Sequence, residues 1–499
     1  MIYDYAVIGG GVSGMTSALI LAKQGFKTAL IEKSTSLAPT IRGFERDGVY
    51  FDTGFHYTGG LGPGEPVDTF LRYLDLIDSI TKVSLRQEGF DSFYCLDPDF
   101  LFEFPYGYEK IRQAFQERFP DDADAVDTYL KAVRGYYHSV PYVNLENDNP
   151  TGRMSDVHGQ TLQEFLDGLT RNTVLKCILS MHCFLYGVSP AEVSMAQHAY
   201  VAGSYYESVH AISGGGRSLT AAFEERLNSA DVNIYCGLPA TSFLISSDGT
   251  FTGICLEDGT HIYAKGCIST VHPLRLLTMA PEAVFRPAYT KRLKELRETP
   301  SACILYAVCE SSVEELERSN IFIFPTPSFD FFGEDKPVDL RPMYITAAGG
   351  RTGAQQSHHG FIAICPMSRE QTRLLTDPVS GERSHDYYAA KEVISREMTH
   401  VLQRSYPHIA EKIISVSCAT PLTLRDYTNS PFGSLYGVQH RTGQYNPMPV
   451  TRLKGLFLAG QAVTAPGIMG AMMSAFVACG AIVGDTKIKQ ELKQCRIDA

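Results

Sequence analysis

The chain has 499 residues, of which 44% are hydrophobic and 20% charged, and its formal net charge is −11 at pH 7. A chain of this length is too long to fold around one small hydrophobic core, so we expect an ordered protein of two interleaved domains. The acidic balance, without a cluster of Lys and Arg, argues against nucleic acid as a partner. The 12 cysteines have irregular spacings and no CxxC pair, which excludes the usual zinc and iron–sulfur sites, so no metal is expected.

The first 34 residues predict a strand, a helix and a second strand. Residues 3–8 form a strand-like run, residues 13–25 are rich in small and aliphatic side chains, and residues 27–34 have the composition of a strand. No basic segment precedes the first strand, so no signal peptide is expected. We therefore expect a cytoplasmic protein and leave peripheral contact with a membrane open.

A glycine fingerprint connects the first strand to the helix. Gly9, Gly11 and Gly14 form G-x-G-x-x-G, in which the glycines permit a tight turn, close approach of a pyrophosphate, and packing of helix on strand. Glu32 ends the second strand 18 residues after Gly14, where an acid accepts ribose hydrogen bonds and disfavours NADP. The pattern indicates dinucleotide binding, with a simple tight turn as the alternative, and does not separate FAD from NAD.

The predicted secondary structure changes twice in the middle of the chain. Helical patterns cover residues 68–80, 108–119 and 122–137. A glycine turn and a helix follow at 213–227, and four short β-like runs separated by Asp-Gly or Gly turns extend from 232 to 270. A mixed region then leads to about residue 414.

Residues 455–476 form another strand–turn–helix, with a turn at Gly460 and glycine and proline where the helix begins. Flavoproteins with a divided cofactor domain close it with such a segment, whose helix N-terminus faces the flavin and favours its anionic reduced form. A buried core helix is the alternative. Because this segment and the fingerprint lie at opposite ends of the chain, we predict a cofactor domain assembled from separate pieces that binds FAD.

Taken together, these segments resemble the phytoene desaturase / carotenoid isomerase / retinol saturase family of FAD-dependent oxidoreductases over essentially the whole chain. The motifs that carry the resemblance are VIGGGVSG with Glu32, FDTGFHYTGG, LYGVSP, ISGGGRSLTAAFEERL, CLEDGTHIYAKGCISTVHP, TPLTLRDYTNSPFGSLYGV and LFLAGQ…PGIMG. The resemblance implies an α/β fold, with a discontinuous Rossmann-like FAD domain of the glutathione-reductase type and an inserted α+β substrate domain. We expect the FAD-binding domain in residues 1–75, 205–285 and 415–499, and the substrate-binding domain in 76–204 and 286–414.

Two short segments resemble the retinol saturase type within this family: Asp-Thr-Gly-Phe-His-Tyr at 52–57, and Gly460-Gln461. Two departures accompany them. Ala462 stands where retinol saturases usually have Asp, and only Arg42-Gly43 remains of a family Gly-Gly-Arg. The cofactor-binding residues implied by the fingerprint and the resemblance are Gly9, Gly11, Gly14, Glu32, Arg42, Gly460, Gln461, Gly467, Ile468 and Met469.

The expected reaction is the saturation of one double bond in an apolar conjugated polyene, which is a retinoid, a carotenoid or a polyene acyl chain. Saturation needs hydride from reduced flavin and a proton delivered nearby. His56 and Tyr57, on a loop expected near the flavin, and Tyr436 are the candidate proton donors. As alternatives, His56 would only hydrogen-bond the backbone of its loop and Tyr436 would only pack.

Other functions remain open. A cis–trans isomerase would use reduced FAD without net electron transfer, a desaturase would remove hydrogens, and a non-enzymatic carrier would hold a pigment. The sequence shows one dinucleotide fingerprint, so the electron donor of a reductase stays unidentified and would be NADH or a small redox protein.

Three further features have a structural interpretation. Glu207 and His210 fit a solvated helix face better than an acid/base pair, and His358-His359 fits a polar loop better than a metal site. The aromatic runs at 92–108 and 320–332 could line a tunnel for a flat polyene or fill sheet cores, and the sequence does not choose.

Overall fold

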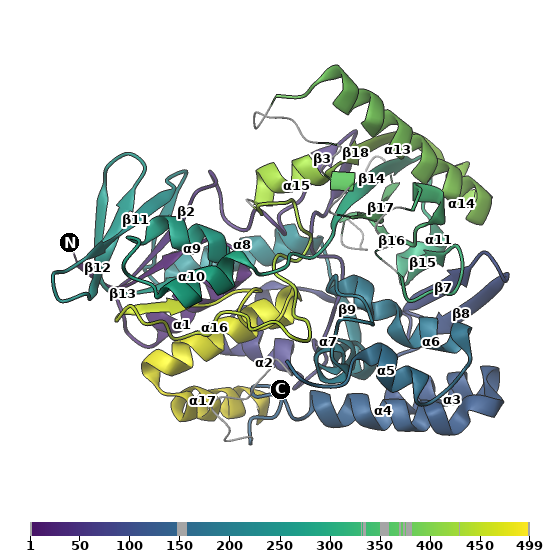
Figure 1. Ribbon diagram of the computed structural model, residues 1–499, viewed down its shortest axis with the longest axis horizontal. Coiled ribbons are helices and arrows are strands. Elements are labelled where there is room, and N and C mark those ends of the chain that lie inside the picture. Colours follow the sequence, from purple (N-terminus) through teal and green to yellow (C-terminus); the bar gives the residue numbers. More distant parts are fainter. Residues whose placement is uncertain are drawn as a thin grey trace.

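The computed structural model describes residues 2–146, 157–330, 332, 336–349, 359–368, 371–372, 375, 382–428 and 430–497. Two large sheets organise the molecule, one on the left and one at the upper right of Figure 1, with a layer of helices below the second. The N-terminal strands in purple and the C-terminal helices in yellow lie side by side in the left-hand part.

The first sheet draws its strands from three separate segments of the chain. Strands β10, β2, β1 and β13 are parallel in that order; β12 and β11 then continue the sheet antiparallel to the start of β13, whereas β19 runs parallel to its end. Their bounds are β1 (Ile2–Ile8), β2 (Thr28–Glu32), β10 (Asn233–Cys236), β11 (Ala240–Ile245), β12 (Phe251–Leu256), β13 (His261–Ser269) and β19 (Leu456–Leu458). The predicted discontinuous Rossmann-like fold is confirmed.

Helices cover both faces of this sheet, so all five residues of β2 are buried. Alternation along the strands decides which side chain meets which layer: Val7 and Leu30 pack on one face, and Ala6 and Ile31 on the other. The first face carries α1 (Val12–Lys23), α2 (Pro66–Tyr73), α8 (Gly215–Ser229), α16 (Gly467–Val483) and α17 (Asp485–Ile497). The second carries α9 (Pro273–Met279) and α10 (Pro287–Lys294).

The helix expected over residues 68–80 is shorter in the structure. Helix α2 ends at Tyr73, and only a single 3₁₀ turn, η1 (Ile77–Ser79), follows it. Asp75 lies between them with φ = +57°, and a residue in the left-handed region stops the helical hydrogen-bond ladder.

The second sheet has the order β18-β14-β17-β16-β15-β7-β8, and only β15 and β7 are parallel neighbours. Its strands are β7 (Asp91–Cys95), β8 (Phe100–Phe104), β14 (Ser301–Cys309), β15 (Asn320–Phe324), β16 (Met343–Ala347), β17 (His359–Met367) and β18 (Ile413–Ala419). One face packs against α11 (Glu314–Glu317), α13 (His385–Ser405) and α14 (Pro407–Ala410). The domain boundary expected between residues 414 and 415 falls inside β18.

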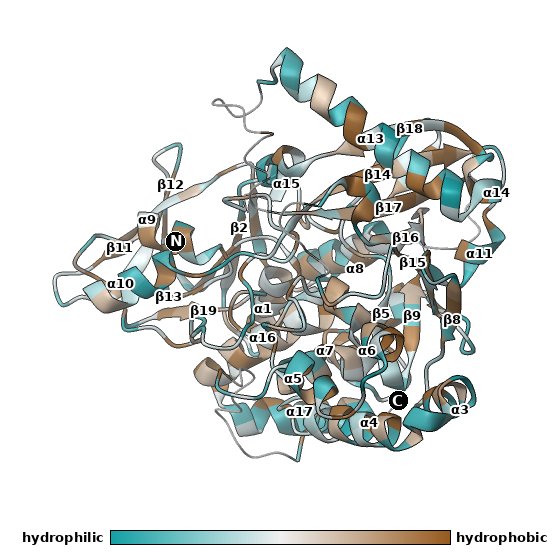
Figure 2. Cartoon of the chain, turned by 45° about the vertical axis from the view of Figure 1, so that its right-hand side comes forward, coloured by the Kyte–Doolittle hydropathy of each residue, from teal (hydrophilic) through white to brown (hydrophobic). Residues whose placement is uncertain are grey.

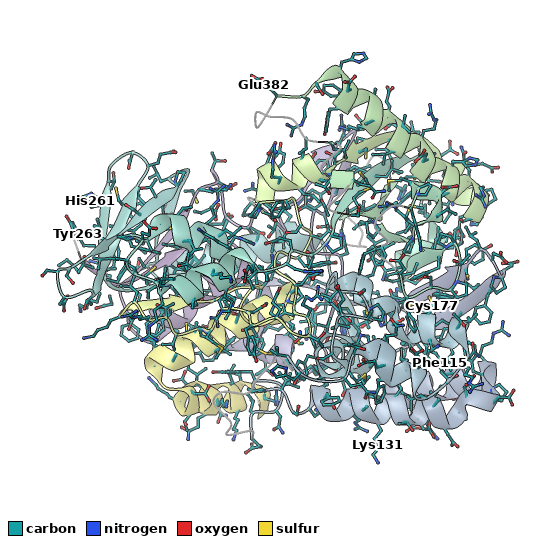
Figure 3. The ribbon with its side chains drawn as sticks, in the orientation of Figure 1. Phe115, Lys131, Cys177, His261, Tyr263 and Glu382 are labelled. Carbon is teal, nitrogen blue, oxygen red and sulfur yellow. The ribbon has the colours of Figure 1, made fainter. Side chains whose placement is uncertain are left out.

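Helices α3 to α7 pack around the β7–β8 end of this sheet. Their bounds are α3 (Tyr108–Arg118), α4 (Ala123–Tyr137), α5 (Leu162–Asp167), α6 (Thr173–Ser180) and α7 (Met195–Glu207), with 3₁₀ turns η2 (Pro120–Asp122) and η3 (Met181–Leu185). In Figure 3, Lys131 projects from the outer side of α4, whereas Phe115 and Cys177, both buried, lie within this part of the molecule. The helices expected at 108–119 and 122–137 are confirmed.

The remaining elements are short. A three-stranded sheet joins β5 (Thr58–Gly59), β9 (Val209–Ile212) and β6 (Lys82–Ser84), and a hairpin pairs β3 (Phe44–Arg46) with β4 (Val49–Phe51). Helix α15 (Pro421–Thr428) follows β18, and the 3₁₀ turn η4 (Val338–Leu340) precedes β16. Hydrophilic and hydrophobic residues share the surface helices α13 and α17 (Figure 2). Within the described ranges, no helix combines the length and apolar composition needed to cross a bilayer.

Candidate functional site

A cavity of about 1460 Å³ extends from the glycine fingerprint of the first sheet to the face of the second sheet. It opens at the carboxyl ends of the parallel strands β1, β2 and β13, where ligands of open α/β sheets bind. Pockets for one drug-sized ligand have volumes of roughly 300–1000 Å³. The cavity therefore has room for a dinucleotide together with a second, smaller molecule.

Each of the three fingerprint positions is a glycine for a different structural reason. Gly9 has φ = +104°, and a Cβ there would lie 2.3 Å from Thr270 Oγ1. A Cβ on Gly14 would lie 1.8 Å from the Gly9 carbonyl oxygen, so this glycine permits helix and strand to touch. A Cβ on Gly11 would meet no atom within 4 Å, because Gly11 faces the cavity. The spacing therefore provides open space where a pyrophosphate would approach the backbone.

The N-terminus of α1 points its free donors at this space. Gly11 is the N-cap residue and has no capping side chain, so the N–H groups of the first turn are available to an anion. Ser13 also lines the cavity; its Oγ is buried and has no hydrogen-bond partner among the described residues. A phosphate at this position would satisfy both the hydroxyl and the N–H groups.

Glu32 has a structural role in addition to the predicted one. Its buried carboxylate accepts hydrogen bonds from the N–H of Gly10 at 2.5 Å and of Ser34 at 2.8 Å. These bonds tie the glycine turn to the end of β2. Because a carboxylate has about four acceptor positions and Glu32 lines the cavity, it can also accept from a ribose hydroxyl.

The C-terminal segment brings a second helix N-terminus to the same cavity. Gly467, with φ = +80°, is the first residue of α16 and, like Gly11, has open space around its Cβ position. Gly460, Gln461 and Ile468 line the cavity beside it. The Gln461 backbone is held from behind, because His440 Nε2 donates to its carbonyl oxygen at 2.6 Å.

Of the remaining residues predicted to bind the cofactor, one lines the cavity and two do not. Arg42 lines the cavity, and its Nη1 donates to the Leu37 carbonyl oxygen at 3.4 Å. Gly14 and Met469 do not line it: Gly14 packs against Gly9, and the Met469 sulfur lies near Gly60. Burial lowers the pKa of His440, so the imidazole behind Gln461 is neutral.

The far end of the cavity is mainly apolar and aromatic. His56, Tyr57 and Tyr436, the three candidate proton donors, all line it. The His56 and Tyr344 rings lie 6.2 Å apart, and the Tyr57 and Tyr205 rings 5.3 Å apart. Apolar and aromatic residues that line the cavity also include Phe184, Leu185, Ile304, Tyr306, Ile364 and Leu435.

A buried hydrogen-bond network lies behind Tyr57. The Tyr57 hydroxyl donates to Asp91 Oδ2 at 3.0 Å, and His182 Nε2 donates to the same oxygen at 3.1 Å. Asn320 Nδ2 donates to Asp91 Oδ1 at 2.6 Å, and the Tyr344 hydroxyl donates to Asn320 Oδ1 at 3.2 Å. Burial, followed by the nearby Asp91 carboxylate, raises the pKa of Tyr57 well above its usual value, so its phenol stays protonated.

Several other sequence interpretations are resolved. The expected common helix face for Glu207 and His210 is wrong, because α7 ends at Glu207 and His210 belongs to β9. Glu207 accepts from His138 at the surface, and His210 is buried. His359 begins β17, and His358 lies outside the described residues. In the part of the chain that the structure describes, no group of three or more His, Cys, Asp or Glu side chains could hold a metal ion.

The aromatic runs mostly fill cores. Phe93, Phe102, Phe322 and Phe324 belong to the core between the second sheet and helices α3–α7, and none of them lines the cavity. The cavity aromatics come instead from scattered positions such as Tyr205.

Sequence reasoning missed Ser13, Asp91, His182, Asn320 and Tyr344. A hydroxyl residue inside the glycine fingerprint was a usable signal for Ser13. The other four come from four separate elements, η3, β7, β15 and β16, and only the pairing of β15 with β7 on one side and β16 on the other brings three of them together. No local spacing reveals such a group.

Comparisons with known proteins agree with this architecture. A family model described as an NAD(P)-binding Rossmann-like domain matches residues 7–74. The all-trans-retinol 13,14-reductase of Rattus norvegicus is 24% identical, over 96% of this chain and 85% of the relative. A 4,4′-diapophytoene desaturase of Staphylococcus aureus is 22% identical, over 93% of this chain and 94% of the relative. A solved oxidoreductase from Methanosarcina mazei shares the fold, with a TM-score of 0.66, 15% identity, and coverage of 95% of this chain and 99% of its own.

Proposed function

Because the chain belongs to the family of FAD-dependent oxidoreductases that includes phytoene desaturases, carotenoid isomerases and retinol saturases, we propose that it reduces a carbon–carbon double bond of a conjugated polyene. The proposal rests on one observation above all. One cavity joins two uncapped helix N-termini to an aromatic end lined by protonatable side chains. Such a cavity can hold a dinucleotide and a flat apolar molecule in contact with each other.

The two helix N-termini are the proposed anchors of FAD. The first turn of α1, with Gly11 and Ser13, would hold the pyrophosphate, and Glu32 would accept from the ribose of the adenosine part. Gly9 and Gly14 shape this turn without needing to touch the cofactor. Arg42 would add a positive charge near the phosphates.

The start of α16 is proposed to hold the opposite end of the cofactor. Gly460, Gln461, Gly467 and Ile468 line this part of the cavity, and the helix dipole there favours negative charge on the flavin. Met469, which follows Ile468 in α16, lies near Gly60 and does not line the cavity.

Bound FAD in its reduced form supplies the hydride that saturation requires. The protein has to align the polyene, exclude water and deliver a proton. The aromatic end of the cavity provides the first two. We assign proton delivery to the loop of His56 and Tyr57, which line the cavity, with Tyr436 as a further candidate donor that lines the same cavity.

The relatives suggest the class of substrate. Their names describe action on all-trans-retinol and on diapophytoene, so the substrate proposed here is a retinoid, a carotenoid or a polyene acyl chain. Reduction is favoured over desaturation because the loop that follows Asp52-Thr53-Gly54 carries protonatable side chains into the cavity. A polyene isomerase is the second candidate, since the same cavity would serve a reaction without net electron transfer.

We further propose that electrons reach the flavin from outside this chain, from NADH or a small redox protein. We also propose peripheral contact with a membrane, from which an apolar substrate would enter. Tyr427 on α15 supports this, because it lines the cavity while 72% of its surface is exposed.

The test is anaerobic mixing of the photoreduced holoprotein with a panel of polyenes. Return of the oxidised-flavin absorbance, together with a shift of the polyene band to shorter wavelength, is the expected result. His56→Ala should slow this single turnover by ~10²–10⁴ if His56 is the acid. A flavin that stays reduced with every polyene while the polyene isomerises would replace the reductase with the isomerase.

A further inference from the structure

Asp91 is a carboxylate without access to solvent, placed one side chain away from the cavity. Its side chain is fully buried, as is that of His182, and the two are joined by a 3.1 Å hydrogen bond. Tyr57 and Asn320 complete its contacts. Of these residues only Tyr57 lines the cavity, so Tyr57 connects the buried group to the substrate end.

The buried charge of Asp91 needs compensation. An unpaired carboxylate in an apolar interior costs far more than its hydrogen bonds to neutral donors return. Tyr57 and Asn320 are neutral donors, whereas the imidazole of His182 can carry a positive charge. His182 Nδ1 is buried without a hydrogen-bond partner among the described residues, so Asp91 alone orients this ring through hydrogen bonding.

The other titratable groups near this pair are tyrosines and one histidine, and phenylalanine rings such as that of Phe90 also pack on His182. The Tyr205 ring stacks on His182 at 6.1 Å, the Tyr206 ring contacts it edge-on at 5.9 Å, and Tyr344 reaches the network through Asn320. Burial raises the pKa of Tyr205 and Tyr206, so these phenols stay neutral. His198, on α7, has a pKa lowered to about 3 by burial and is neutral as well.

The direction of the Tyr57 hydroxyl raises a chemical question. Its one proton is donated to Asp91, away from the cavity. If Tyr57 alone protonated the substrate, a tyrosinate would be left beside the Asp91 carboxylate, with both charges buried. That arrangement is unfavourable unless a proton arrives from behind at the same time.

We infer that Tyr57, Asp91 and His182 form a proton relay that ends at the substrate carbon, an inference that rests on the reductase function proposed above. For the transfer, the Tyr57 hydroxyl turns from Asp91 toward the carbon that bears negative charge after hydride addition, and the O–H bond breaks as a C–H bond forms at this carbon. The phenolic oxygen takes a proton from Asp91 as Asp91 takes one from His182 Nε2. The substrate anion and the His182 cation thus disappear together, and Asp91 and Tyr57 regain their starting states.

Within the relay, Tyr57 touches the substrate, and Asp91 and His182 are positioning residues that act through it. Tyr57 is the member of the relay that lines the cavity, so water that enters after product release would meet Tyr57 first. The proton is therefore returned to His182 along the same path in reverse. Asn320 donates to the second Asp91 oxygen and so helps to hold the carboxylate in its orientation toward Tyr57.

The experiment compares His182→Gln with a matched control, His198→Gln, in the FAD-loaded full chain. Glutamine can still donate to Asp91 but cannot release a proton. His198 is a second fully buried histidine of the same core, bound to the hydroxyls of Tyr129 and Tyr186, and it does not line the cavity. Single-turnover reduction of a polyene is followed from about pH 6 to pH 9, with the concentration of polyene that gives half the maximal rate.

The relay predicts a rate that is ~10²-fold or more lower for His182→Gln, without the pH dependence of the wild type and with the half-saturating polyene concentration unchanged. The rate of Tyr57→Phe should fall by a similar factor. The rate of the double variant Tyr57→Phe/His182→Gln should fall no further than that of either single variant, because the residues act as one unit. His198→Gln should keep the wild-type rate and pH profile. Histidine labelled with ¹³C should show a doubly protonated His182 ring that becomes neutral in Asp91→Asn.

A wild-type rate and pH profile in His182→Gln would overturn the relay and leave only a structural hydrogen bond. A neutral His182 ring in the resting wild-type protein would overturn it as well, with or without turnover data. These results differ from failure of the proposed function, in which the wild type itself returns every polyene without added hydrogen.

Discussion

Gly11 offers the sharpest test of where the cofactor binds. Replacing it with Val should not disturb the fold, because Gly11 has φ = −73° and ψ = 178°, which any residue adopts, and a Cβ there meets nothing within 4 Å. The new side chain would occupy the space proposed for the pyrophosphate. Losing two charge-assisted hydrogen bonds from the start of α1 costs about 3–6 kcal/mol, or ~10²–10⁴ in affinity.

The assay is flavin content after purification, followed by titration of the apoprotein with FAD by fluorescence quenching. Gly135→Val is the matched control, because Gly135 also has open space at its Cβ position and lies in α4, away from the cavity. This control should keep its flavin. A folded Gly11→Val protein with a full complement of FAD would refute the placement of the pyrophosphate at α1.

The remaining predictions concern Glu32 and His210. Glu32→Gln should weaken FAD binding about ten- to hundred-fold. It should also lower the melting temperature of the apoprotein, because the amide cannot accept from both Gly10 and Ser34. Unchanged affinity for FAD with a lowered melting temperature would leave Glu32 only its structural role. Burial lowers the pKa of His210 to about 4, below its unfolded value of ~6.5, so its contribution to stability is present above about pH 6.5 and is lost as the pH falls toward 4. When the pH is lowered from 7 to 5, the free energy of unfolding measured with urea should therefore fall by about 1–2 kcal/mol less in His210→Gln than in the wild type. An equal fall in the two proteins would show that His210 does not titrate on unfolding.

Much of the fold was predictable because its signals are local. The glycine fingerprint, the acid at the end of the second strand and the closing strand–turn–helix each lie within a few residues of sequence, and the structure gives β1–α1–β2 and β19–α16 at those positions. The helix over 68–80 was overestimated because its pattern continues past Asp75, whose backbone conformation is not visible in the pattern. Where the mixed region pairs its strands depends on long-range register, and β18 accordingly belongs to the second sheet rather than to the C-terminal segment.

The candidate site was predictable only where a motif carries it. Glycines with open space at the cavity, such as Gly11 and Gly467, follow from motif position, and His56 and Tyr57 follow from a loop that the resemblance singled out. Asp91 gave no signal, because it begins an ordinary apolar strand and its partners come from distant elements. The same limit applies to Glu207 and His210, whose spacing suits a helix although the helix ends between them.

The mass of the product formed in a single anaerobic turnover tests the central claim most directly. The FAD-loaded protein is reduced, freed of excess reductant and mixed with one equivalent of polyene, and the extracted polyene is weighed by mass spectrometry. The account predicts a product heavier than the substrate by two hydrogens, with one flavin oxidised for each product formed. A product of unchanged mass would contradict the reductase and assign isomerisation instead. A product lighter by two hydrogens, formed when the flavin is oxidised at the start, would contradict the reductase and assign desaturation.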